Sequence, residues 1–471
     1  MAQPNILVII CDQLSAQALP AWGNDFASTP NINALISSGV SFDSAYSNCP
    51  LCQPSRASFW TSRYPHQTGV LANGEPFPVS SVNAGINTLG TLFHHAGYET
   101  VHFGKQHDAG ALRGFQCVPI QESETEPAHP SLSHNYDTRQ DRYTRQRAVD
   151  FLESYSKQKP FLAVTDFNNP HNICGWIGEN AEARPLKKTF DLLPSLPDNL
   201  YLSESEFSNR PIPIRYLASA HRRQAQISEW DELKIRHYLH AYHHYLSLVD
   251  SEIGHILNAL HQRDDAQDTL VVFFSDHGDS MCGRWMATKH TSFYEETMHV
   301  PLAFSGAGIE PKDHRIEGLC SLLDLLPTLC DFADIIPPQD IEGRSLYEAI
   351  TADHPTLDLH QAVYAQWHTE WGHTIEPGRM VRTPRYKYTH YRECYGTELY
   401  DLQTDPGETH NLAFNPEYTD ILKNHHDLLN TYITQSNDPY WSMDFKVDPV
   451  LRQHKPTYRN YQGPLSLDVV S

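Results

Sequence analysis

The stretch "NILVIICDQ", Asn5 to Gln13, decides the fold, because an unbroken apolar run passes directly into polar residues. A strand that is apolar at every position is buried on both faces, as in a parallel sheet covered by helices. Three more runs rich in apolar residues lead into polar residues in the same way: "YETVHF" before Gly104, "PFLAVTDF" before Asn168 and "TLVVFF" before Ser275. The sequence therefore predicts an α/β fold with a mostly parallel central sheet.

Side chains suited to catalysis follow each of these runs. They are Asp12 and Gln13 after the first, Lys105 and His107 after the second, His171 after the third, and Asp276 and His277 after the fourth. In open α/β sheets the ligand site lies beyond the carboxyl ends of the strands. We therefore expect these side chains to form one site at that edge of the sheet.

A chain of 471 residues is too long for one ordinary core, and its pattern changes near residue 360. The later part contains the short alternating segments "RMVRTPRYKYTHYRE" and "TELYDLQTD", and then the amphipathic helical pattern "YTDILKNHHDLLNTYITQ". We expect a catalytic α/β domain over 1–358 and a smaller C-terminal α+β subdomain with an antiparallel sheet over 359–471. The weakly periodic stretch 172–229 is either a loop that covers the site or a packed surface excursion.

Composition excludes several classes of partner. The formal net charge of −22 argues against nucleic acid and against an anionic membrane. The nine cysteines are irregularly spaced, which favours reduced thiols over a disulfide framework. We find no apolar stretch that approaches the roughly 18 residues of a membrane span and no basic region typical of a signal peptide. We therefore expect a cytoplasmic protein, or a periplasmic or secreted one if a leader has been removed.

The stretch "NCPLCQPSRASFWTSRYPHQTG", from Asn48 to Gly69, has two incompatible interpretations. Cys49 and Cys52 form a CxxC, the spacing of redox dithiols and of half a zinc site. No second CxxC exists in the chain to complete a zinc site. Cys52 and Arg56 belong to a CxPxR, in which the proline favours a helix beginning near Cys52. There, unpaired backbone N–H groups favour an anion beside the cysteine.

The CxPxR, followed by "ASFWTSRYPHQTGV", resembles the signature of the type I, formylglycine-dependent sulfatases. Further stretches match the motifs of this family in order: "PNILVIICDQ", "GYETVHFGKQH", "PFLAVTDFNNPH", "LVVFFSDHGD", "FYEETMHVPL" and "ELYDLQTDPGETHNL". The resemblance implies an alkaline-phosphatase-like α/β sandwich. It also implies that a formylglycine-generating maturation enzyme oxidises Cys52 to an aldehyde, whose hydrate is the nucleophile.

By the same resemblance, one divalent cation binds beside the nucleophile. The implied ligands are Asp12, Gln13, Cys52, Asp276 and His277, and the implied ion is Ca²⁺, with Mg²⁺ or Mn²⁺ as alternatives. Hard cations of this kind prefer oxygen ligands, which the two aspartates supply. Many family members have a second aspartate where this chain has Gln13, so the site here carries one negative charge fewer.

The resemblance also assigns roles to the basic residues. Arg56, Lys105 and a lysine of "TKHTSFYEE" hold the sulfate, His171 protonates the leaving group, and His107 takes a proton from the hydrated aldehyde. Counting back from the tyrosine of "FYEE" leaves two candidates for that lysine position, Lys289 and His290. Lys289 is the first choice, because a full positive charge suits sulfate better than an imidazole does.

We therefore interpret the chain as a sulfatase that hydrolyses a sulfate ester, on a sulfated saccharide or polysaccharide, through a covalent intermediate on modified Cys52. Two alternatives remain. The first is a phosphonate monoester or phosphodiester hydrolase, because related enzymes use the same aldehyde and metal. The second is a non-catalytic binder of sulfated glycans in which Cys52 is never modified.

Overall fold

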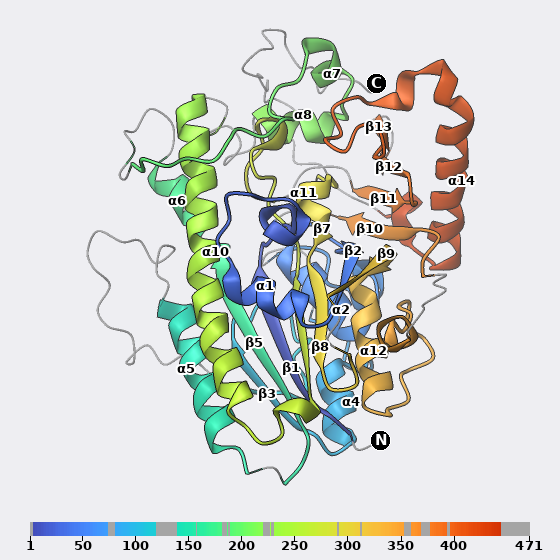
Figure 1. Ribbon diagram of the computed structural model, residues 1–471. Coiled ribbons are helices and arrows are strands. Elements are labelled where there is room, and N and C mark those ends of the chain that lie inside the picture. Colours follow the sequence, from blue (N-terminus) through green and yellow to red (C-terminus); the bar gives the residue numbers. More distant parts are fainter. Residues whose placement is uncertain are drawn as a thin grey trace.

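The computed structural model describes residues 3–443, apart from residues 74–80, 119–138, 157, 181–185, 187–188, 220–226, 228–229, 290–291, 311–312, 353–358, 369–376 and 393–395. Its main feature is a nine-stranded, mostly parallel sheet with helices on both faces (Figure 1). This architecture confirms the fold class that the four apolar runs predicted.

The strand order of the central sheet is β4-β3-β5-β1-β6-β8-β2-β7, with β9 paired to β2. The strands are β1 (Asn5–Asp12), β2 (Val40–Tyr46), β3 (Glu99–Gly104), β4 (Gln116–Val118), β5 (Phe161–Pro170), β6 (Thr269–Ser275), β7 (His299–Val300), β8 (Leu302–Gly306) and β9 (His314–Ser321). Strands β4, β3, β5, β1 and β6 run parallel, and β8 pairs antiparallel with both β6 and β2. The four predicted strands are thus the adjacent β3, β5, β1 and β6.

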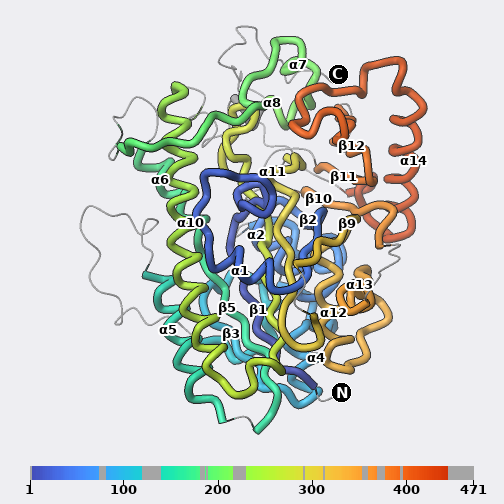
Figure 2. The backbone as a smooth tube through the Cα atoms, in the orientation of Figure 1, coloured from blue at the N-terminus to red at the C-terminus, as the bar shows by residue number. Residues whose placement is uncertain are grey.

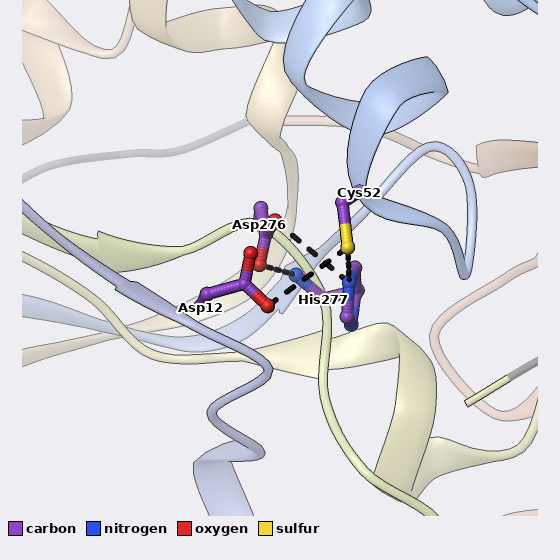
Figure 3. A group of neighbouring side chains, drawn as sticks. All are labelled: Asp12, Cys52, Asp276 and His277. Atoms are coloured by element: carbon purple, nitrogen blue, oxygen red, sulfur yellow. Dashed lines mark hydrogen bonds and ion pairs between the residues drawn. The ribbon is translucent and has the colours of Figure 1, made fainter. Parts of the chain in front are cut away.

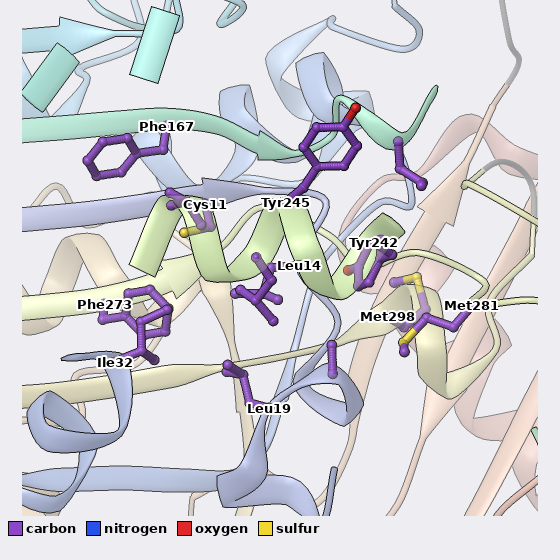
Figure 4. Close-up of a cluster of buried hydrophobic side chains, with 14 of the residues drawn as sticks. Cys11, Leu14, Leu19, Ile32, Phe167, Tyr242, Tyr245, Phe273, Met281 and Met298 are labelled. Carbon is purple, nitrogen blue, oxygen red and sulfur yellow. The ribbon is translucent and has the colours of Figure 1, made fainter. Parts of the chain in front are cut away.

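Alternate residues of β1 enter different hydrophobic cores, which is why its sequence is apolar throughout. One core contains Ile6, Val8 and Ile10, and the opposite core contains Leu7, Ile9 and Cys11. Figure 4 shows the second core, in which Cys11 and Leu14 lie near Tyr242 and Tyr245 of the long helix α10 (Glu232–His261). Burial on both faces fixes β1 at the centre of the sheet, so its polar end at Asp12 is held in place.

The helices lie on the two faces of the sheet (Figure 1). Around α10 are α1 (Pro30–Ser37), α5 (Arg139–Ser154) and α6 (Ile173–Glu179), and against the other face lie α2 (Cys52–Thr61), α4 (Leu89–His95) and α12 (Leu325–Phe332). Shorter helices are α3 (Pro65–Thr68), α7 (Glu204–Ser208), α8 (Ile212–Ser219), α11 (Glu295–Met298) and α13 (Tyr347–Thr351). The described parts of 172–229 therefore contain three short helices, so the expectation of a largely irregular segment was too simple there.

A second sheet forms the C-terminal part of the chain. It is antiparallel, with the order β10 (Val363–Trp367), β11 (Gly378–Arg382), β12 (Tyr386–Tyr391) and β13 (Gly396–Asp401), and α14 (Thr419–Gln435) packs on it. This confirms the predicted α+β character of the region. The exact boundary between 358 and 359 stays a prediction, since 353–358 lie outside the described residues. Among the described helices, none combines the length and the apolar character needed to span a membrane.

Candidate active site

The carboxyl ends of β1, β3, β5 and β6 meet at one edge of the central sheet, as expected. Cys52 lies beside this edge as the first residue of α2, so the helix begins where the proline of the CxPxR predicted. Its sulfur lies 3.0 Å from Lys289 Nζ and 3.1 Å from His277 Nε2. The His107 and His171 side chains also interact with the thiol. Residues far apart in sequence thus converge on one sulfur atom.

Basic side chains are the nearest charged neighbours of the Cys52 sulfur. Burial opposes ionisation of the thiol, but the charges of Lys289, His277 and Lys105 outweigh it and hold the pKa of Cys52 well below its usual range. Lys105 Nζ lies 2.6 Å from Asp12 Oδ2, and Lys289 Nζ lies 3.8 Å from Asp12 Oδ1. Any group in place of this sulfur would therefore be stabilised as an anion.

Arg56 is completely buried and is surrounded by carboxylates. Its Nε donates to Asp276 at 2.9 Å, one terminal nitrogen donates to Asp12 at 3.2 Å, and the terminal pair forms a fork with Asp166. Asp108 lies 3.7 Å from the same guanidinium. In this arrangement Arg56 neutralises and orients the acidic side chains, and the predicted contact with sulfate stays a prediction.

Four side chains place donor atoms within 4.8 Å of one another: Asp12, Cys52, Asp276 and His277. Figure 3 shows them pointing toward a common centre. Burial and the nearby Asp12 charge raise the pKa of Asp276 to about 6, so a cation between the two carboxylates would relieve their repulsion. His277 Nδ1 lies 2.9 Å from the carbonyl of Gly278, which leaves Nε2 directed at the centre as a ligand atom.

Gln13 completes this donor set with an amide oxygen. Its Oε1 accepts from Lys289 Nζ at 2.7 Å, so the oxygen lies on the side of Cys52. Two carboxylates and an amide oxygen suit a hard divalent cation, whereas the imidazole of His277 is a less usual ligand for calcium. The residues present fit the predicted metal group.

A divalent cation would reverse the sign of the net charge in the site. Arg56, Lys105 and Lys289 face the four carboxylates of Asp12, Asp108, Asp166 and Asp276. With the His277 imidazole and the Cys52 thiol in their neutral forms, the cluster carries one net negative charge. That is a poor environment for an anionic ester. A divalent cation makes the net charge of the cluster positive, so the cluster then attracts an anion.

The competing interpretations of single residues find no support in the described part of the chain. Cys49 and Cys52 are both free thiols, and burial raises the pKa of Cys49 above its usual value. The histidines of α10 form no metal-type cluster, since the ring of His240 stacks on Phe190 at 3.6 Å.

The segment Tyr294–Glu296 of the "FYEE" motif joins the active-site segment to the second sheet. Tyr294 Oη donates to Glu398 at 2.7 Å, and Lys387 Nζ donates to Glu295 at 2.8 Å. The same Lys387 lies 2.6 Å from a carboxylate oxygen of Glu408. These charged groups are buried, so we call the five residues the buried clasp. The clasp fixes the chain a few residues after Lys289.

Four residues that contact the site were not singled out from the sequence: Asp108, Asp166, Asp279 and Tyr238. Asp108 directly follows His107, and Asp166 and Asp279 lie inside the quoted "PFLAVTDFNNPH" and "LVVFFSDHGD" stretches. An acid within a strand-end motif was therefore a usable signal. No sequence signal identified Tyr238, because helical periodicity predicts only that it lies on the buried face of α10.

Comparison with known proteins decides the family. A sequence model of the sulfatase family matches residues 4–335, and a model of the N-sulphoglucosamine sulphohydrolase C-terminal region matches residues 283–435. The chain belongs to the formylglycine-dependent sulfatase family. This sulfatase is therefore a sulfuric ester hydrolase, which confirms the enzyme class predicted from the motifs.

Individual relatives agree along the whole length. The sulfatase is 42% identical to the Δ4,5-hexuronate-2-O-sulfatase of Bacteroides thetaiotaomicron, over 99% of this chain and 96% of the relative. The solved structure of a 2-O GAG sulfatase matches with a TM-score of 0.89 and 41% identity, covering 99% of this chain and 100% of the other. The phosphonate monoester hydrolase of Agrobacterium radiobacter matches with a TM-score of 0.72, 22% identity, and coverage of 92% and 96%. That identity shows a shared fold alone.

Lys289→Ala is expected to lower kcat/KM about 100- to 1,000-fold, the usual cost of removing one pre-organised donor from a developing anion. The reason is its position 3.0 Å from Cys52 Sγ and 2.7 Å from Gln13 Oε1. His290 lies outside the described residues, so His290→Ala is the natural comparison and should cost less. Near-normal kinetics of Lys289→Ala beside a crippled His290→Ala would reverse the assignment.

Proposed function

We propose that this sulfatase removes sulfate from a sulfated saccharide, with a 2-O-sulfated hexuronate unit as the first candidate. The observation that carries the substrate proposal is the 42% identity, along almost the whole of both chains, to a Δ4,5-hexuronate-2-O-sulfatase. The similarity to a 2-O GAG sulfatase supports the same class of substrate.

The nucleophile in this proposal is Cys52 after conversion to formylglycine by a maturation enzyme. The hydrated aldehyde supplies a hydroxyl oxygen where the sulfur now lies. Lys289 and His277 lie within 3.1 Å of this position, and the charges of Lys289, His277 and Lys105 lower the pKa of the group there. They would stabilise an oxygen nucleophile in the same way.

Asp12, Gln13, Asp276 and His277 would hold the divalent cation, and we propose calcium. When bound, the ion would act as a Lewis acid that polarises the nucleophile and the sulfate group. Lys105 and Lys289 would then bind the sulfate as well as interact with Asp12. Lys105 Nζ donates to Asp12 at 2.6 Å and Lys289 Nζ lies 3.8 Å from it, so a cation bound to Asp12 would weaken both attractions and leave the ammonium groups to donate to the sulfate.

His171 is the proposed acid for the leaving alkoxide. Burial and the positive charges of Lys105 and Lys289 lower the pKa of His171 to about 3, so the imidazole is neutral before substrate binds. The negative sulfate group would raise this pKa, because it neutralises the two lysines. His107, which follows the carboxyl end of β3, is the proposed group that takes a proton from the hydrated aldehyde.

The test is a panel of esters assayed by release of sulfate or phosphonate. A disaccharide with a 2-O-sulfated unsaturated hexuronate is expected to exceed 4-nitrophenyl sulfate in kcat/KM by at least about 100-fold. The aryl ester lacks the remote contacts that can be used to stabilise the transition state. A 6-O-sulfated glucosamine is the matched control for position, and phenyl phosphonate tests the rival chemistry. Efficient cleavage of the aryl or phosphonate ester, with no saccharide desulfated, would refute the proposal.

A further inference from the structure

Gln13 is held at both ends of its side-chain amide. Nε2 donates to Asp279 Oδ2 at 2.6 Å, and Oε1 accepts from Lys289 Nζ at 2.7 Å. A carboxylate accepts and an ammonium group only donates, so these two partners leave the amide a single orientation. Gln13 is completely buried, and water therefore cannot substitute for either partner.

Asp279 is itself fixed by donors on its far side. Tyr238 Oη lies 3.0 Å from each of its oxygens, and the backbone N–H of Met281 donates to Oδ1 at 2.8 Å. Tyr238 belongs to α10, which is labelled in Figure 2, and its hydroxyl also accepts from the backbone N–H of Thr288 at 3.3 Å, in the chain between β6 and α11. The orientation of the Gln13 amide is thus set from the helix, through Asp279.

We propose that Asp279 is a positioning residue that turns the amide oxygen of Gln13 toward Lys289 and the cation site. An aspartate at position 13 would not need such a partner, because its two oxygens are equivalent. A glutamine has one oxygen and one nitrogen, so the wrong orientation would present N–H groups to a cation and to an ammonium group. The part of this inference that concerns the cation rests on the proposed function, whereas the placement of Lys289 does not.

Asp279→Asn is the first test, because it preserves shape and keeps one oxygen for Tyr238 and Met281. Its new amide nitrogen would face Gln13 Nε2, and two donors cannot bond. Gln13 is then expected to turn over, which directs Nε2 at Lys289. Crystal structures of the calcium-free proteins should show Lys289 Nζ displaced from Gln13 and from residue 52. Calcium affinity, measured by titration calorimetry, should fall about 10- to 100-fold, as for other partners that orient metal ligands.

The double variant Gln13→Glu/Asp279→Asn reverses the hydrogen bond, since the asparagine donates and the glutamate accepts. Gln13→Glu alone places two carboxylates together and should also impair calcium binding. The double variant should bind calcium better than either single variant, which is a coupling that a merely structural role of Asp279 does not produce. Unchanged amide orientation and affinity in Asp279→Asn, or a double variant no better than the worse single one, would overturn the proposal.

Asp250→Asn is the matched control, because Asp250 is also a buried acid, and its hydrogen bonds go to Asn31 and to the backbone of Ile32 rather than to residues of the site. It should lower thermal stability and leave calcium affinity unchanged. If Asp279→Asn does not fold, Tyr238→Phe removes a donor from Asp279 and should give a smaller loss of affinity, whereas no loss would count against us. If wild-type protein binds no calcium, the proposed metal site fails, and the calcium-free structures still decide whether Asp279 places Lys289.

Discussion

Cys52→Ala is expected to abolish hydrolysis of every ester that the wild-type enzyme cleaves, with kcat reduced about 10,000-fold or more. The sulfur of Cys52 is the point on which Lys289, His277, His107 and His171 converge, and no other described thiol or hydroxyl has this set of contacts. Substrate binding should persist, because the cationic groups remain. Turnover and equilibrium binding of the same saccharide measure the two effects separately.

Cys49→Ala is the matched control for this prediction. Cys49 lies three residues earlier and is equally buried, but burial raises the pKa of its thiol, and its sulfur has none of the active-site contacts. This variant should lose about 1–2 kcal/mol of stability and keep its activity. Mass spectrometry of the peptide should show oxygen in place of sulfur at Cys52 only. An equally inactive Cys49→Ala, together with a disulfide between the two cysteines, would restore the dithiol interpretation.

Asp12→Asn and Asp276→Asn are each expected to weaken calcium binding about 100-fold or more and to lower kcat in parallel. Each change removes one of the two carboxylates from a hard cation whose affinity depends on ligand charge. The change also leaves the buried cluster without one of the partners of Arg56 or Lys105, so thermal unfolding must be measured beside calorimetry.

Asp324→Asn provides the comparison for that loss of stability. Asp324 is completely buried and lies 2.9 Å from His360, away from the active site. It should destabilise the protein and leave calcium affinity intact. A fully active wild-type enzyme from which every divalent cation has been removed would contradict the metal assignment.

The central part of the fold was predictable because a strand that is buried on both faces has an almost continuously apolar sequence. The apolar run of β1 could belong only to a strand covered on both faces, and the runs of β3, β5 and β6 repeat that pattern. Elements at the periphery of the fold have a weaker sequence pattern. The short helices α6, α7 and α8 lie in a stretch rich in proline and polar residues, where tertiary contacts rather than periodicity decide the structure.

The convergence of these residue types at one edge of the sheet was predictable, but their mutual contacts were not. Position and motif order identified Asp12, Lys105 and Asp276, because strand ends meet at a known edge of a parallel sheet. The burial of Arg56 among four carboxylates, and the orientation of the Gln13 amide by Asp279, depend on side-chain directions that spacing does not encode.

The buried clasp has a consequence for how this protein unfolds. Separating the second sheet from the central sheet would break the contacts of Glu295 with Lys387 and of Tyr294 with Glu398 and would expose these groups to water. Residues of both sheets, among them Leu7 and Met380, also share one continuous core. The two regions should therefore melt in a single cooperative transition and resist limited proteolysis as one body, and a fragment cut at the predicted boundary should not fold by itself.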